Sequence, residues 1–79
     1  MKFVNSYFKS KKILFLGYDT NSTRLIKELE IRGYEVIHCE NNIQFDNYYL
    51  AISFGYRQIL SSKTIRAIDC PIINLHMSY

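Results

Sequence analysis

The stretch Lys12-Ile13-Leu14-Phe15-Leu16-Gly17 decides the fold class of this chain. Between its lysine and its glycine it is continuously apolar, without polar residues at alternate positions. A strand buried on both faces of a parallel sheet has this composition, because helices cover both of its sides. The stretch therefore predicts a small α/β domain whose sheet is mostly parallel.

Three further segments complete a predicted four-stranded sheet. Tyr34–Cys39 is the expected second strand, Tyr48–Phe54 the third and Ile72–His76 the fourth, and we expect the last two to be buried. The polar stretch 40–47 is shorter than the dozen or more residues of a usual parallel crossover. The short connection thus predicts a reduced sheet.

Two helices are expected against this sheet. The first follows a turn at 18–22 and runs to about Arg32, before Gly33. The second is short and ends before Pro71. The candidate capping residues are Asp19, Thr20, Asn21 and Ser22 for the first helix and Ser61 or Ser62 for the second, and the predicted inner faces carry Ser22, Leu25, Ile26, Leu29, Ile65 and Ile68.

The basic charge of the chain is local. Of its ten Lys and Arg residues, Lys2, Lys9, Lys11 and Lys12 stand before or at the start of the first strand, and the rest of the chain is close to neutral by formal count. We therefore divide the chain into a basic leader, 1–11, and a domain, 12–79. The leader has either a weak attraction to nucleic acid or anionic lipid, or no role beyond solvation. No nucleic-acid surface is expected on the domain.

The cysteines and the hydropathy pattern bear on location. Cys39 and Cys70 are far apart and form no CxxC pair, so neither a zinc site nor a disulfide framework is expected. Residues 1–10 lack the apolar core of a signal peptide, and apolar stretches fall well short of the ~20 residues that a membrane span needs. The expected location is the cytoplasm, without membrane association.

Polar residues follow three of the predicted strands. In a parallel sheet these ends meet at one edge, where ligands bind, and here they carry 17–19, 55–57 and 74–76. Asn74 and His76 stand two apart on an extended segment, so their side chains point to the same side. A carboxamide can donate to a developing oxyanion, and an imidazole can move protons near neutral pH.

Other polar residues have competing interpretations. The turn 17–22 has one glycine where a dinucleotide fingerprint needs three, and it lacks the Gly-Lys-Ser/Thr of a P-loop. It either holds an anion or simply turns the chain. His38 has no evident partner on its strand and is either a functional histidine or a surface or core histidine whose hydrogen bonds are satisfied. Arg57 is either a ligand clamp or a surface residue.

Two blocks of the sequence resemble the folate-dependent formyltransferase family. The ending Asn74-Leu75-His76-Met77-Ser78-Tyr79 is similar to the family's Asn-x-His-x-Ser-Leu-Leu-Pro signature. The stretch 50–61, LAISFGYRQILS, resembles the family strand and loop that run into an Ile-Leu-Pro or Ile-Leu-Ser turn, at a fitting distance from the signature. The resemblance covers nearly all of the chain from Lys12 onward and implies a truncated, Rossmann-like amino-terminal formyltransferase domain.

The resemblance also implies roles for single residues. Asn74 and His76 would correspond to the family's catalytic asparagine and histidine. The segment Gln58, Ile59 and Leu60 would correspond to the loop whose backbone holds the pterin of 10-formyltetrahydrofolate. The implied reaction is formyl transfer to a primary amine through a tetrahedral intermediate, so the implied partners are a small-molecule folate and an amine acceptor.

The chain departs from the family in ways that leave alternatives open. The family's catalytic aspartate and the Leu-Pro turn that follows the signature have no counterpart here, so we expect the chain to be inactive by itself. One alternative is a non-catalytic α/β module that binds or self-associates through an exposed sheet edge. Another is a nucleotide-binding half-domain, which the single glycine at the first turn disfavours.

Overall fold

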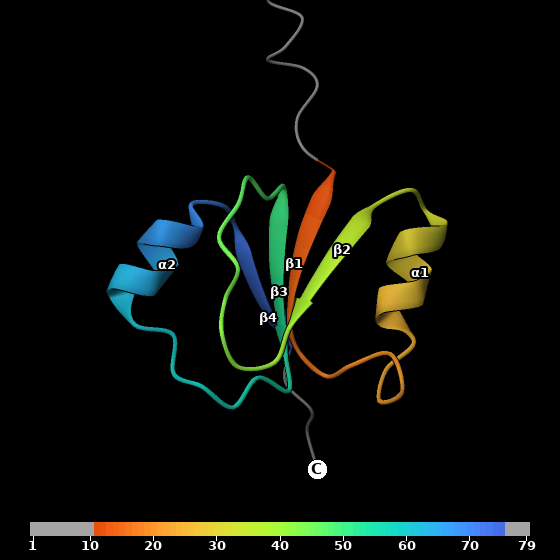
Figure 1. Ribbon diagram of the computed structural model, residues 1–79, viewed down its shortest axis with the longest axis horizontal. Helices are drawn as coiled ribbons and strands as arrows, with labels where there is room; N and C mark the ends of the chain where they lie inside the picture. The colour runs from red at the N-terminus through yellow and green to blue at the C-terminus, as the bar shows by residue number, and fades with distance from the viewer. Residues whose placement is uncertain (1–10, 76–79) are drawn as a thin grey trace, which may run out of the picture.

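The structure is a computed structural model that describes residues 11–75, and its centre is a four-stranded sheet in which all strands run parallel (Figure 1). In spatial order the strands are β2-β1-β3-β4. The predicted α/β fold with a parallel sheet is therefore confirmed. The strands span β1, Lys12–Gly17; β2, Glu35–Cys39; β3, Leu50–Phe54; and β4, Ile72–Leu75.

The first strand is the most buried element. Its side chains from Ile13 to Leu16 are at most 1% exposed. It pairs with β2 from Lys12↔Glu35 onward and with β3 from Ile13↔Leu50 onward, so both of its hydrogen-bonding edges are occupied. Burial on both faces explains why this stretch carries no alternating polar residues.

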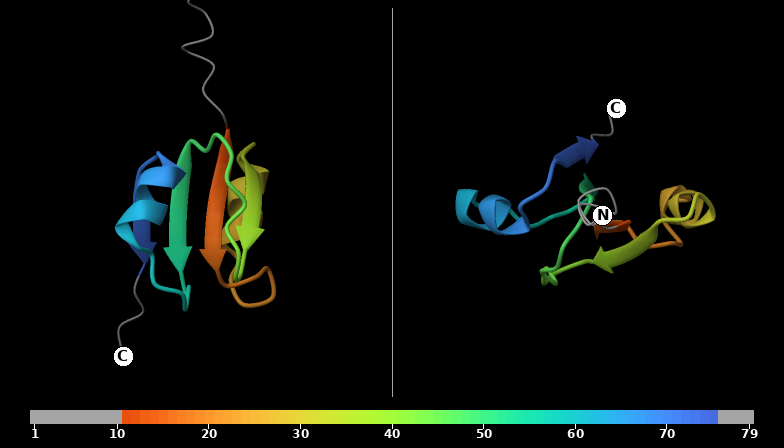
Figure 2. Two further views of the ribbon diagram at one scale, coloured as in Figure 1. Left: turned by 60° about the vertical axis from the view of Figure 1, so that its left-hand side comes forward. Right: turned by 90° about the horizontal axis from the view of Figure 1, so that it is seen from above.

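One helix lies on each face of the sheet, as the view from above shows (Figure 2). Helix α1 (Leu25–Ile31) packs with Ile13 and Phe15, whereas α2 (Ser62–Ile68) lies on the side of Leu14 and Leu16. Side chains alternate along β1 and so feed two separate cores. The α1 core contains Ile13, Phe15, Ile26 and Ile52, and the α2 core contains Leu14, Leu16, Cys39, Tyr48, Ala51 and Ile68.

The connection from β2 to β3 contains no helix and crosses the sheet on the α2 side (Figures 1 and 2). Tyr48 fills the place that a helix would cover: its ring is 7% exposed and its hydroxyl donates to the Gln44 carbonyl. The sequence had suggested that the third strand begins at Tyr48, but Tyr48 belongs to this connection and β3 begins at Leu50. The short crossover is possible because one aromatic ring replaces a helix face.

The first helix is shorter than predicted. It begins at Leu25, and its amino-terminal cap is Arg24, without a side-chain cap hydrogen bond. The predicted capping residue Asp19 instead accepts hydrogen bonds from the backbone of Asn21 and Ser22, and so holds a turn ahead of the helix. Ser22 is exposed and does not lie on the inner face. The expected end at Gly33 is confirmed, with φ +95° directly after the helix.

The second helix and the last strand differ in burial from the prediction. Ser61 caps α2, as expected, by accepting from the Thr64 backbone. Ile65, however, is 44% exposed, so only Ile68 anchors the helix. Strand β4 was expected to be buried, but three of its four residues are exposed because it lies at the sheet edge and α1 does not reach it. The predicted buried strand is therefore an edge strand.

We expect Gly17→Ala to destabilise the domain far more than Gly33→Ala. Both glycines have positive φ, but a Cβ on Gly17 would lie 2.0 Å from the Phe54 carbonyl oxygen, whereas one on Gly33 would meet nothing within 4 Å. Backbone strain alone costs about 1–2 kcal/mol, and the collision at Gly17 should bring its loss above about 3 kcal/mol. Urea unfolding followed by circular dichroism measures both. Equal losses for the two variants would contradict the close approach of β1 and β3.

Candidate functional site

The direction of the chain reverses between β1 and β3, and a cavity lies at that point. From β1 the chain goes to β2 on one side, and then returns past β1 to β3 and β4. In open parallel sheets, ligands bind where the carboxyl ends of two such strands diverge. This switch-point cavity has a volume of about 380 Å³ and is lined by Gly17, Tyr18, Asp19, Ser22, Glu40, Asn41, Gly55, Arg57 and Gln58.

Two glycines and a tyrosine ring form its base. Gly17 and Gly55 both have positive φ, at +117° and +77°. A Cβ on Gly55 would lie 2.5 Å from the Tyr18 ring, which packs edge-on against Phe54 with ring centroids 4.9 Å apart. The Tyr18 backbone also donates to the Phe54 carbonyl at 2.9 Å. The ends of β1 and β3 are thus fixed to one another, and the base of the cavity is preformed.

Asp19 organises the turn at one side of the cavity. Its Oδ1 atom accepts from the backbone N–H groups of Asn21 and Ser22, at 3.0 Å each. The pKa of Asp19 is lowered, chiefly by a hydrogen bond from the Ser22 side chain and also by these backbone amides and the nearby His38, although desolvation opposes this. The carboxylate therefore keeps its negative charge at neutral pH.

His38 does not line the cavity but supports it from β2. Its Nε2 atom lies 2.7 Å from the Gly17 carbonyl oxygen, and since a carbonyl only accepts, Nε2 carries the proton. The half-buried ring also packs near Phe15, at 6.4 Å between centroids. Of the alternatives that the sequence left open for His38, the structure favours a histidine whose hydrogen bond is satisfied within the fold.

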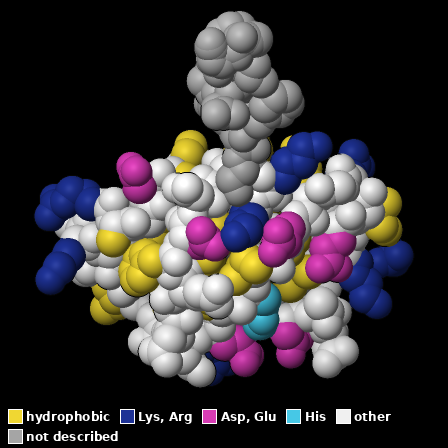
Figure 3. All heavy atoms as spheres, turned by 45° about the horizontal axis from the view of Figure 1, so that its top comes forward, with side chains coloured by type: hydrophobic (Ala, Val, Ile, Leu, Met, Phe, Trp, Pro, Cys, Tyr) yellow, Lys and Arg dark blue, Asp and Glu magenta, His cyan; other side chains and the backbone are white. Residues whose placement is uncertain are grey.

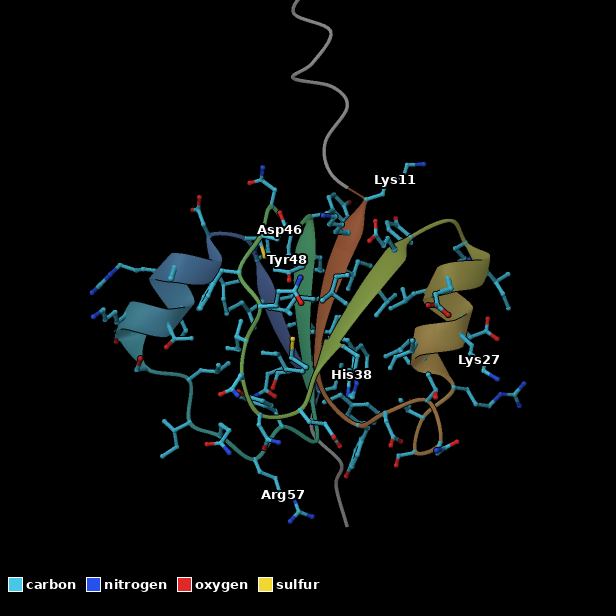
Figure 4. All side chains as sticks on the ribbon, viewed as in Figure 1. Lys11, Lys27, His38, Asp46, Tyr48 and Arg57 are labelled. Atoms are coloured by element: carbon cyan, nitrogen blue, oxygen red, sulfur yellow. The ribbon has the colours of Figure 1, made fainter. Side chains whose placement is uncertain are left out.

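The charged residues of the cavity are two acids and one base. Asp19 and Glu40 supply carboxylates, and Arg57 supplies the cation, but its side chain extends away from the sheet at the carboxyl edge (Figure 4). On the face seen in Figure 3, Lys and Arg side chains lie mostly toward the flanks and are interrupted by acidic ones. The cavity wall is thus mildly acidic, and that face carries no continuous basic patch.

A second, shallower hollow lies beside the first and contains the segment predicted to hold folate. This loop groove, of about 280 Å³, shares Asn41 and Gln58 with the switch-point cavity. Ile59 is 94% exposed at its rim. The groove is lined by Asn41, Asn42, Ile43, Phe45, Tyr56, Gln58, Ile59, Leu60 and Thr64.

The predicted catalytic residues lie apart from both hollows or outside the described residues. Asn74 lies on the edge strand β4, paired in register with Ser53, and lines neither the cavity nor the groove. His76 lies outside the described residues 11–75. The structure thus brings Gln58, Ile59 and Leu60 together in one hollow and leaves Asn74 one strand away. The catalytic and folate-binding roles of all five residues stay predictions.

Two residues of the switch-point cavity, Glu40 and Asn41, were missed as ligand-binding candidates in the sequence, and both directly follow β2. Ser22 belongs to the turn 17–22, for which anion binding was one of the two interpretations. The overlooked signal is the acid at the end of the second strand, a position that commonly contacts ligand in parallel sheets.

The described residues offer little other site chemistry. Between residues 11 and 75, no group of three or more His, Cys, Asp or Glu side chains could hold a metal ion. Cys39 and Cys70 are free thiols, and burial raises the pKa of Cys70, with a further contribution from the charge of Asp69. Neither helix in this range is long and apolar enough to cross a membrane.

No family model matches this sequence, and neither a curated protein nor a solved structure matches it.

Proposed function

We propose that this chain is part of a folate-dependent formyltransferase and that its carboxyl edge binds 10-formyltetrahydrofolate for formyl transfer to a primary amine. The proposal rests on the resemblance of two sequence blocks to that family. The observation that supports it best is the loop groove, because the segment that resembles the pterin-binding loop, 58–60, lines a hollow.

The side chains of the loop groove suit a flat heterocycle. Ile43, Phe45, Tyr56, Ile59 and Leu60 offer apolar surface. Amide groups at its rim offer donors and acceptors to the edge of a ring, and ligand sites commonly combine an apolar wall with a few polar groups. The exposed Ile59 and Phe45 would lose contact with water on binding, which favours association.

The placement of Asn74 is compatible with a catalytic role at the same edge. It stands near the end of β4, and β4 runs parallel to β3, whose end begins the loop to 58–60. Its carboxamide would stabilise the oxyanion of the tetrahedral intermediate, and His76 would assist proton transfer from the amine. Asp69 does not supply the missing carboxylate, because it precedes β4 and so lies at the opposite end of that strand.

A second candidate function is association of two copies through β4. Within the described residues, β4 has a strand neighbour, β3, on one side only, so its outer side is an edge at which another strand can add. Ile73 and Leu75 are 45% and 36% exposed on the face that α1 leaves uncovered. An antiparallel pairing of β4 with its copy would cover both features. This observation favours a non-catalytic binding module.

We expect a reduced folate to bind the chain weakly at the loop groove. Amide NMR titration should shift signals of 58–60 and Thr64. Ile59→Ser should weaken binding by about tenfold, the scale of losing one buried aliphatic contact. Ile31→Ser is the matched control, since Ile31 is also exposed, at 77%, but lies on α1. Shifts confined to residues before β1, or equal effects of the two variants, would contradict the folate site.

We expect the chain alone to show no enzyme-like formyl transfer, because no carboxylate in it matches the family's catalytic aspartate. Fused to the remaining part of a family formyltransferase, it should support turnover. There Asn74→Ala or His76→Ala should lower kcat by roughly a hundredfold or more, the scale of losing an oxyanion donor. Asn47→Ala is the control, because Asn47 comes just before β3 and so lies at the amino end of the strands. An amine formylation assay measures all of these, and full activity of Asn74→Ala would refute its role.

If association through β4 is the function, the chain should form a dimer that Ile73→Lys weakens by at least about tenfold, since a charge on an edge strand opposes pairing. Ile31→Lys, an equally apolar exposed position on α1, should leave the dimer intact. Sedimentation equilibrium measures both constants. A chain that stays monomeric at high concentration would rule this candidate out.

A further inference from the structure

The switch-point cavity offers the Glu40 carboxylate and the Ser22 hydroxyl, which do not line the loop groove, and it shares two amides with that groove. Among the described residues the Glu40 carboxylate has no hydrogen bond or ion pair, and it is exposed at the cavity wall. Ser22, Asn41 and Gln58 add a hydroxyl and two amides. The cavity volume of about 380 Å³ is within the usual range for small-molecule sites.

The turn after β1 is closed to phosphate. In parallel nucleotide-binding domains the free backbone N–H groups after the first strand meet the phosphate. Here the N–H groups of Asn21 and Ser22 are already bonded to the Asp19 carboxylate at 3.0 Å. The Asp19 carboxylate thus accepts the hydrogen bonds that a bound phosphate would otherwise accept from these two groups. The wall carries two carboxylates, of Asp19 and Glu40, against the single guanidinium of Arg57, so its net negative charge opposes a phosphate.

Hydroxyl groups fit the same wall. A carboxylate that directly follows the second strand accepts hydrogen bonds from ribose hydroxyls in dinucleotide-binding domains, and Glu40 holds that position after β2. The amides of Asn41 and Gln58 can pair with further hydroxyls, and the Tyr18 ring provides an apolar surface for the carbon face of a sugar.

We propose that the switch-point cavity binds the vicinal diol of a phosphate-free sugar, with Glu40 accepting from the two hydroxyls and Asp19 excluding the phosphorylated form. The source of the diol is either a ribonucleoside or a free sugar. This site shares Asn41 and Gln58 with the loop groove but is centred on other residues, and it does not depend on the proposed formyl transfer.

Four ligands test the proposal by amide NMR titration of the full chain: adenosine, 2′-deoxyadenosine, AMP and ribose. Adenosine should shift signals of Gly17, Asp19 and Glu40. The deoxy analogue, which lacks the diol, and AMP, which adds the phosphate, should each bind at least about tenfold more weakly. If ribose binds as tightly as adenosine, the site is assigned to free sugars. If ribose binds more weakly than adenosine, the site is assigned to nucleosides.

Two variants connect the effects to single residues. Glu40→Gln should weaken the binding of adenosine by about tenfold. Glu30→Gln should leave adenosine binding unchanged, because Glu30 is an exposed acid on α1. Asp19→Asn keeps an Oδ1 acceptor for the turn but removes the negative charge. The Kd of AMP should therefore come to within about threefold of the Kd of adenosine in this variant.

Several outcomes would overturn the proposal. AMP or 2′-deoxyadenosine that binds as tightly as adenosine would contradict it, as would a failure to bind either adenosine or ribose at about 10 mM. So would an Asp19→Asn variant that keeps the full preference for adenosine over AMP, or equal effects of Glu40→Gln and Glu30→Gln on adenosine binding. Shifts confined to 59–64 would place the ligand in the loop groove and would also contradict it. Folate binding is read from Ile59, Leu60 and Thr64, which line only the loop groove, and diol binding from Gly17, Asp19 and Glu40, which line only the switch-point cavity. The failure of either site is therefore visible without the other.

Discussion

The burial of β1 on both faces is the constraint on which the rest of this structure depends. Its four central side chains divide two by two between the cores, and each core holds one helix. With α1 contributing Ile26 and α2 contributing Ile68 as their only buried residues, neither seven-residue helix would be stable without this strand. The strand order follows as well, because the crossover through α1 places β2 on one side of β1, and the helix-free crossover on the opposite face brings β3 to the other side.

The same arrangement determines where a ligand can bind. Because the chain diverges between β1 and β3, the two strand ends leave a gap that only glycines and the Tyr18 ring partly fill. The loops that follow β2 and β3 surround this gap, and Asn41 and Gln58 contribute to both hollows. A ligand in one hollow would therefore contact residues that also form the wall of the other.

The sequence carried most of the fold but little of the detail at element ends. Continuous apolar runs predicted the parallel strands correctly, since burial on two faces leaves a local signature. Burial of β4 could not be inferred from Ile72 and Ile73, because an edge position depends on which element covers the strand. The start of α1 was missed because Asp19 bonds within its own turn, a choice between two local hydrogen-bond patterns that composition does not distinguish. Glu40 was overlooked although the strand before it was predicted, because the cavity that it lines also needs the ends of β1 and β3, which come together only in the folded sheet.

Different contacts hold the starts of the parallel strands, at the amino edge of the sheet, and their ends, at the carboxyl edge. At the amino edge, Lys12 pairs with Asp46 at 2.6 Å, Tyr34 stacks on Tyr49, and the Tyr49 backbone donates to Lys12. These contacts connect β1, β2 and the crossover, so that end resists local opening. The carboxyl edge relies on the glycine contacts and on single hydrogen bonds such as that of His38. Because the ends of β1 and β3 are held together at the base of the cavity, changes in the shape of the two hollows should come from the loops after β2 and β3, while the strands keep their positions.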